Sequence, residues 1–111
     1  MPKLDFETTR NGTVAIVSPT GELDLSGAAI LEAELERLTD DSELAAVVLD
    51  MRGLEFMDSS GLRLVVVADM RAREAGRRFS LVRGDETVHR VFEITRMSDR
   101  LDFVDGDGPA T

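Results

Sequence analysis

Two hydrophobic periods alternate along the chain, and the changes between them separate predicted strands from predicted helices. From Leu4 to Thr8 apolar and polar residues alternate, which is typical of a half-buried strand. Residues 13–18 are rich in β-branched side chains, and the turn signal Asn11-Gly12 precedes them. The pattern predicts an antiparallel opening hairpin. Pro19-Thr20-Gly21 interrupts it, and Glu22-Leu23-Asp24 is predicted as a separate short strand.

The middle of the chain predicts one helix and one buried strand. After Ser26-Gly27, leucines recur at helical spacing up to Leu38, and this amphipathic helix is expected to end near Thr39-Asp40-Asp41. Residues 44–50 form a short, almost continuously apolar run, as expected for a central strand covered on both faces. Residues 51–57 are interpreted as a loop.

A second helix is predicted from Asp58 to Gly76. Its apolar face is expected to contain Leu62, Val65, Val66 and Met70. A strand at 78–82, a helix capped by Asp85 and a last strand at 101–104 complete the expected elements. His89 is expected on the surface of that last helix or half-buried in it.

This order of elements predicts an α/β fold with a mixed β-sheet and helices packed on it. The hairpin is antiparallel, and the part that alternates with helices is parallel. We expect a single domain over residues 1–111, with its core at about 4–104 and a flexible acidic tail at 105–111.

Composition narrows the classes of partner and chemistry. The chain has 111 residues and a net charge of −9, which disfavours binding to nucleic acids and to anionic membranes and favours a basic protein surface. It contains no cysteine and one histidine, so disulfides, thiol catalysis and histidine clusters are excluded. No apolar signal region or membrane-spanning run is recognised. We therefore expect a cytoplasmic protein. We also expect that it needs no cofactor or metal and that it is a monomer or weak dimer.

The candidate site is the sequence Asp58-Ser59-Ser60-Gly61-Leu62 at the start of the second helix. Backbone N–H groups point outward at a helix start, which suits an anion, and phosphorylation turns a serine into one. A plain helix cap at Asp58 is the simpler alternative. Gly61 is expected to leave the serines accessible to another protein. Met57 and Phe56 are both considered as exposed apolar contacts, and core packing is preferred for Phe56.

Three motifs together resemble the STAS domain, and more narrowly the bacterial anti-sigma-factor antagonists. They are Gly21-Glu22-Leu23-Asp24, Val47-Val48-Leu49-Asp50, and Phe56 to Leu62. The resemblance covers residues 4–104. It implies that Ser59 is phosphorylated by an anti-sigma factor that is also a serine kinase. Unphosphorylated, the family member binds that anti-sigma factor and releases the sigma factor; a serine phosphatase restores it after phosphorylation.

The resemblance also implies which residues meet the partner. They are expected around the motif and its helix: Asp24, Met57, Asp58, Ser59, Ser60, Gly61 and Arg63. The helix that usually follows the last strand of the family is expected to be missing or shortened here.

Two other functions compete with this one. A STAS domain could instead serve a stressosome-like scaffold or a transporter complex. An enzyme with Ser59 as nucleophile is disfavoured, because no histidine or lysine stands near it in the sequence to act as base. A magnesium site at Asp24, Asp50 and Asp58 is also disfavoured, because a kinase brings its own metal.

Overall fold

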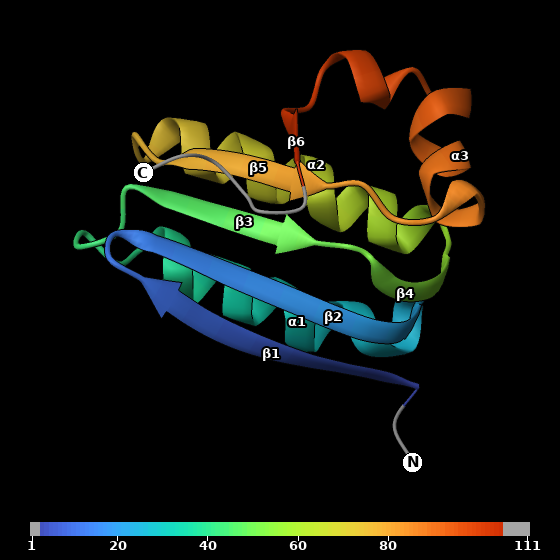
Figure 1. The fold of residues 1–111 in the computed structure, drawn as a ribbon, viewed down its shortest axis with the longest axis horizontal. Helices are drawn as coiled ribbons and strands as arrows, with labels where there is room; N and C mark the ends of the chain where they lie inside the picture. Colours follow the sequence, from blue (N-terminus) through green and yellow to red (C-terminus); the bar gives the residue numbers. More distant parts are fainter. Residues whose placement is uncertain (1–2, 106–111) are drawn as a thin grey trace.

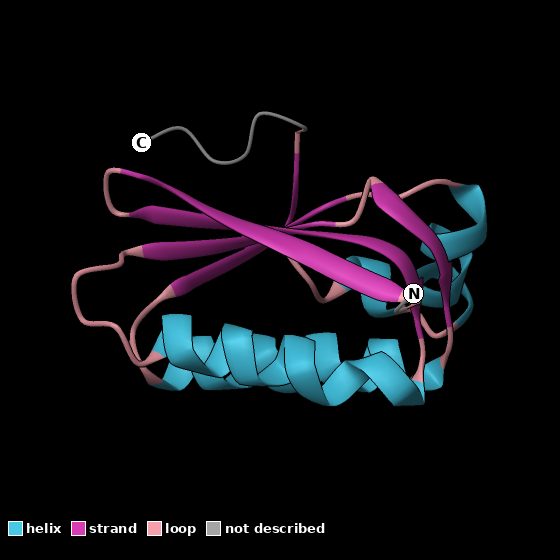
Figure 2. Ribbon diagram, turned by 90° about the horizontal axis from the view of Figure 1, so that it is seen from below, coloured by secondary structure: helices cyan, strands magenta, loops and turns pink. Residues whose placement is uncertain are grey.

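The computed structural model describes residues 3–105 and places its two long helices on one face of a mixed sheet (Figures 1 and 2). The third α-helix lies at the end of the sheet. In chain order the elements are β1 (Leu4–Asn11), β2 (Val14–Leu23), α1 (Leu25–Thr39), β3 (Ala46–Asp50), β4 (Gly53–Met57), α2 (Ser59–Glu74), β5 (Arg78–Val82), α3 (Glu86–Ile94), the 3-10 turn η1 (Met97–Asp99) and β6 (Phe103–Val104).

The sheet confirms the predicted mixed topology. β1 and β2 form the antiparallel hairpin, with Asn11 opposite Val14, and all other strand pairs are parallel. The strand order is β1-β2-β3-β5-β6, and β4 lies beside the second half of β2. The described chain has no helix after β6. The predicted tail lies outside the described residues, apart from Asp105.

The predicted break at Pro19-Thr20-Gly21 is wrong, because β2 continues through it to Leu23. β2 pairs with β3 through residues 14–17 and with β4 through residues 20–23. Pro19 has no N–H to donate, and it stands between these two pairings, where β2 is in register with neither parallel neighbour. Its place marks the change of neighbour within one strand.

The predicted loop at 51–57 is also wrong, since residues 53–57 form β4. Its two buried side chains, Leu54 and Met57, are three positions apart and do not show the period of two expected for a strand. The register with β2 shifts between Gly21 and Glu22, so Glu55 is an extra residue in β4. This bulge turns both buried side chains toward the same core.

Helices α1 and α2 cover the sheet through leucine, valine and alanine side chains. The buried side chains of α1 include Leu31, Leu35 and Leu38, as the spacing predicts. On α2 the buried face contains Leu64, Val65, Ala68 and Ala72, and it is rotated from the predicted one. Leu62 and Val66 are half-buried and Met70 is 54% exposed. The two alanines let α2 pack closely, although their small side chains give little hydrophobic signal. No helix between residues 3 and 105 has both the length and the apolar character to cross a membrane.

His89 is more buried than expected, with 6% of its surface exposed. Its ring centroid lies 6.0 Å from that of Phe92 on α3 and 5.0 Å from that of Phe103 on β6. Its Nδ1 atom has no hydrogen-bond partner among the described residues. Burial lowers the pKa of His89, and the nearby Arg83 lowers it further, while Glu93 acts in the opposite direction.

The stability of the fold is therefore expected to depend on pH through His89. Because the folded pKa is depressed, the unfolded chain binds the proton more readily, and stability is lost as pH falls below about 6.5. The slope reaches at most about 1.4 kcal/mol per pH unit. Urea unfolding between pH 7.5 and 5 measures it. His89→Phe should remove most of the slope between pH 7.5 and 6, since the chain has one histidine and its carboxylates titrate at lower pH; an unchanged slope in the variant over that interval would rule out His89 as its source.

Candidate functional site

Two helix starts lie side by side at one edge of the sheet. In the parallel pair of β2 and β4, Leu23 stands opposite Met57. The next residue in each strand is an aspartate that caps a helix, Asp24 for α1 and Asp58 for α2. Both helices begin with the same pattern, Asp-x-Ser-Gly, at residues 24–27 and 58–61. The sheet register therefore brings two copies of one capping motif together.

The caps hold these helix starts by hydrogen bonds from the backbone. Oδ1 of Asp58 accepts a hydrogen bond from the Ser60 N–H at 2.8 Å, which confirms the predicted cap. Oδ1 of Asp24 accepts from the Ser26 N–H at 3.0 Å and from the Ser26 hydroxyl at 2.6 Å. The first helix thus begins at Leu25, before the predicted start at Ser26-Gly27. The Ser26 hydrogen bonds hold the pKa of Asp24 below its usual value, and Lys3 contributes.

Ser59 is the first residue of α2 and is exposed, whereas Ser60 is half-buried. The hydroxyl of Ser59 makes no hydrogen bond to the rest of the described chain. The equivalent position in α1 is Leu25, which is 79% exposed. Of the two capping motifs, only the one in α2 presents a hydroxyl at this outermost position.

Gly61 and Met57 lie beneath the surface, which contradicts the expected accessibility. A Cβ atom on Gly61 would lie 2.4 Å from Cγ of Met57 and 3.0 Å from Cδ2 of Leu23. The glycine therefore lets the start of α2 approach β2 and β4, and it does not open a path for a partner. Met57 is 4% exposed. Phe56, for which core packing was preferred from the sequence, is 43% exposed.

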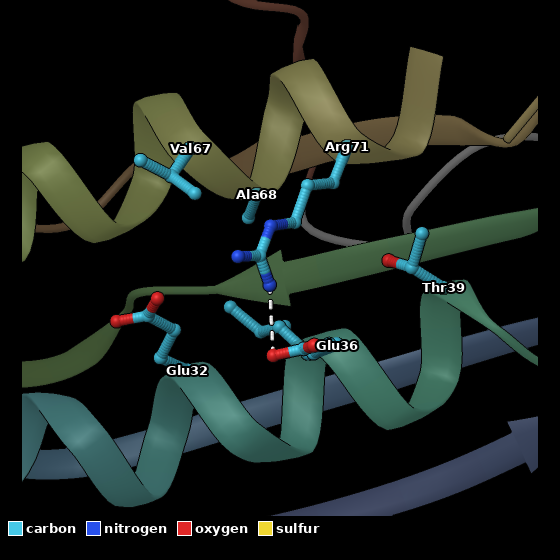
Figure 3. Close-up of a pocket in the computed structure, with 7 residues that line it drawn as sticks. Glu32, Glu36, Thr39, Val67, Ala68 and Arg71 are labelled. Carbon is cyan, nitrogen blue, oxygen red and sulfur yellow. Dashed lines mark ion pairs between the residues drawn. The ribbon is translucent and has the colours of Figure 1, made fainter. Parts of the chain in front are cut away.

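A groove runs from the two caps between α1 and α2. It has a volume of about 630 Å³, and we call it the α1–α2 groove. Leu25, Ala29 and Glu32 of α1 and Ser59, Ser60 and Arg63 of α2 line it. Farther along the helices, Nη1 of Arg71 lies 2.7 Å from Oε2 of Glu36, and this ion pair joins α2 to α1 (Figure 3).

The structure divides the predicted site residues into three groups, of which the first is the buried pair Met57 and Gly61. Arg63, Ser59 and Ser60 share the groove. Asp24 and Asp58 cap its two walls. Leu25 and Ala29 were missed in the sequence, although the repeated Asp-x-Ser-Gly pattern could have indicated Leu25.

Asp50, the third aspartate considered for a magnesium site with Asp24 and Asp58, forms an ion pair with Arg52. Asp50 ends β3, and its Oδ2 lies 2.8 Å from Nη2 of Arg52. Burial opposes the charge of Asp50, but the hydrogen bonds from Arg52 outweigh it, so the pKa of Asp50 lies below its usual value. Between residues 3 and 105 no group of three or more acidic, histidine or cysteine side chains is arranged to hold a metal ion.

Comparison of the sequence with models of known protein families assigns the chain to one of them. The model of the STAS domain matches residues 5–105. The chain belongs to the STAS domain family. The predicted resemblance to this family is thereby confirmed.

Named relatives of this STAS domain agree with the narrower resemblance. An anti-sigma F factor antagonist of Paenibacillus polymyxa is 23% identical over 104 residues, which cover 94% of this chain and 89% of the relative. The crystal structure of an anti-sigma factor antagonist from Mycobacterium paratuberculosis matches with a TM-score of 0.82 at 23% identity, over 90% of this chain and 84% of that one.

The anti-sigma factor antagonist SpoIIAA has the same fold in two states. Its unphosphorylated form matches this STAS domain with a TM-score of 0.79 at 20% identity, over 93% of this chain and 90% of that one. The phosphorylated form of the Bacillus protein matches with a TM-score of 0.73 at 19% identity, over 93% and 94%. At these identities the structural matches establish the fold.

Proposed function

We propose that this STAS domain is an anti-sigma factor antagonist that phosphorylation of Ser59 switches off. The observation that carries the proposal is the position of Ser59: an exposed hydroxyl at the first residue of α2, at the mouth of a groove. The names of its relatives support the general role. In this proposal the unphosphorylated domain binds an anti-sigma factor in the cytoplasm and thereby releases the sigma factor.

The anti-sigma factor is also the serine kinase in this proposal. The Ser59 Oγ attacks the γ-phosphorus of ATP, the bond from that phosphorus to the bridging oxygen breaks, and ADP leaves. The hydroxyl proton passes to a base of the kinase, and the magnesium ion is the kinase's own. A serine phosphatase later hydrolyses the phosphoserine to serine and inorganic phosphate. The STAS domain is thus the substrate of the kinase and the surface on which the kinase docks. In this proposal it acts as a monomer or weak dimer.

Mapping the phosphate after incubation with the anti-sigma kinase and ATP tests this proposal. One phosphate is expected, on Ser59; Ser60→Ala should retain it and Ser59→Ala should lose it. Peptide mass spectrometry locates the site. A phosphate that persists in Ser59→Ala would show that the acceptor is another residue.

The equivalent position on α1 offers a matched control. In the double variant Ser59→Ala/Leu25→Ser, the only hydroxyl at the first helical position lies on α1, within the same four-residue motif. We expect no phosphate on it, because the kinase docks around α2. Phosphorylation of this variant would show that the kinase reads the short motif and not the surface around Ser59.

A further inference from the structure

Arg63 is one helical turn beyond Ser59 on α2. The two residues are separated by four positions, or about 6 Å along the helix axis, which is the spacing at which side chains of one helix meet. Both line the α1–α2 groove, so they lie on the same side of α2. The hydroxyl and the guanidinium therefore share one stretch of surface.

Arg63 also differs from the arginines farther along α2. Arg71 pairs with Glu36 at 2.7 Å, and Arg73 pairs with Asp69 at 3.0 Å. Arg63 is exposed and makes no ion pair or side-chain hydrogen bond within residues 3–105. Glu32, the acidic residue of the groove, is not within ion-pair distance of it. An anion at Ser59 could engage Arg63 without breaking an existing pair.

We propose that a phosphate on Ser59 draws Arg63 into an intrahelical ion pair that closes the Ser59 end of the α1–α2 groove. This inference rests on the proposed phosphorylation of Ser59. A phosphate offers several acceptor oxygens to the planar donor fork of a guanidinium. The order is also the favourable one, with the anion N-terminal to the cation on the same helix.

Besides the negative charge that it adds, phosphorylation would change partner binding through the proposed pair of phosphoserine 59 and Arg63. Asp58 precedes Ser59, so the phosphate adds negative charge beside a carboxylate that is already present. Arg63 compensates part of that charge within the domain. At the same time it is withdrawn from any acidic group of a partner that would contact it in the unphosphorylated state. The groove then presents an anion where it presented a free cation.

A phosphorus-31 NMR titration tests the pair by measuring the pKa of the phosphate. It uses the full chain, with phosphoserine incorporated at position 59 during translation. A nearby cation favours the dianion and lowers the second pKa of the phosphate, which is ordinarily about 6. Arg63→Gln should therefore raise that pKa by about 0.15–0.4 unit. Arg63→Lys keeps the charge and should restore most of the lower value.

Arg73→Gln is the matched control, because it removes the same charge from the same helix at a position more than two turns farther from Ser59. It should shift the phosphate pKa by less than about 0.1 unit. Equal shifts in Arg63→Gln and Arg73→Gln would overturn the proposed pair. Because no kinase is used, this result is independent of the phosphate-mapping experiment: the pair can fail while Ser59 remains the acceptor, and the reverse.

Discussion

Replacing Gly61 with valine is expected to lower the free energy of unfolding by about 2–3 kcal/mol. A Cβ atom at this position lies 2.4 Å from Cγ of Met57, which is close to the backbone of β4 and has little freedom to move. The two methyl groups of valine add to the clash. Helix α2 must then move away from β2 and β4. Urea unfolding followed by circular dichroism measures the loss.

Gly27 supplies the control for this prediction, because it holds the same position in the capping motif of α1. A Cβ atom there would lie 3.0 Å from Cβ of Leu4, which is half-buried on the edge strand β1 and is able to shift. Gly27→Val is expected to cost at most about 1 kcal/mol. Met57→Ala should recover part of the loss in the Gly61→Val background. Equal losses at the two glycines would contradict the tight packing assigned to Gly61.

Phosphoserine at position 59 is expected to weaken binding to the anti-sigma factor by a hundredfold or more. The phosphate adds about 1.5 to 2 negative charges at neutral pH next to Asp58. Contacts between like charges within an interface cost several kcal/mol, and a hundredfold change in affinity corresponds to about 2.8 kcal/mol. The helix dipole offsets only about 0.3–1 kcal/mol of this cost. Isothermal titration calorimetry with the purified anti-sigma factor measures the difference.

A phosphoserine at position 42 controls for charge alone. Ser42 is exposed in the turn between α1 and β3, at the opposite ends of the helices from Ser59. Its phosphate should change the affinity by less than about threefold, since exposed charges beyond about 10 Å are largely screened. If phosphates at 42 and 59 weakened binding equally, net charge and not the α2 start would account for the effect.

The elements with a clear period were predictable from the sequence. The hairpin, α1, β3, β5 and the capped start of α2 follow from leucine spacing, β-branched runs and the Asn11-Gly12 and Asp58 signals. β4 was not predictable in this way, because its bulge separates Leu54 and Met57 by three positions. The predicted buried face of α2 is rotated from the observed one because Ala68 and Ala72 are buried, and their small side chains give little hydrophobic signal in the sequence.

The candidate site was predicted as a list of residues but not as an arrangement. The two serines after Asp58 are found from a local signal, since a capping aspartate and the hydroxyls that follow it are neighbours in the chain. The choice of Ser59 between them is what the resemblance to the STAS family implies. The roles of Phe56, Met57 and Gly61 depend on which side of β4 and α2 they face, and that is set by pairing with β2. Leu25 becomes relevant only because Leu23 stands opposite Met57, which brings residues of α1 and α2 together across a long stretch of sequence.

The most direct test of the account is the displacement of a fluorescent sigma factor from its anti-sigma factor by the two forms of this chain. The unphosphorylated protein should release the sigma factor in proportion to its concentration. The chain with phosphoserine at position 59 should require at least a hundredfold higher concentration for the same release. Equal release by both forms, or no release by the unphosphorylated form, would contradict a Ser59-controlled antagonist.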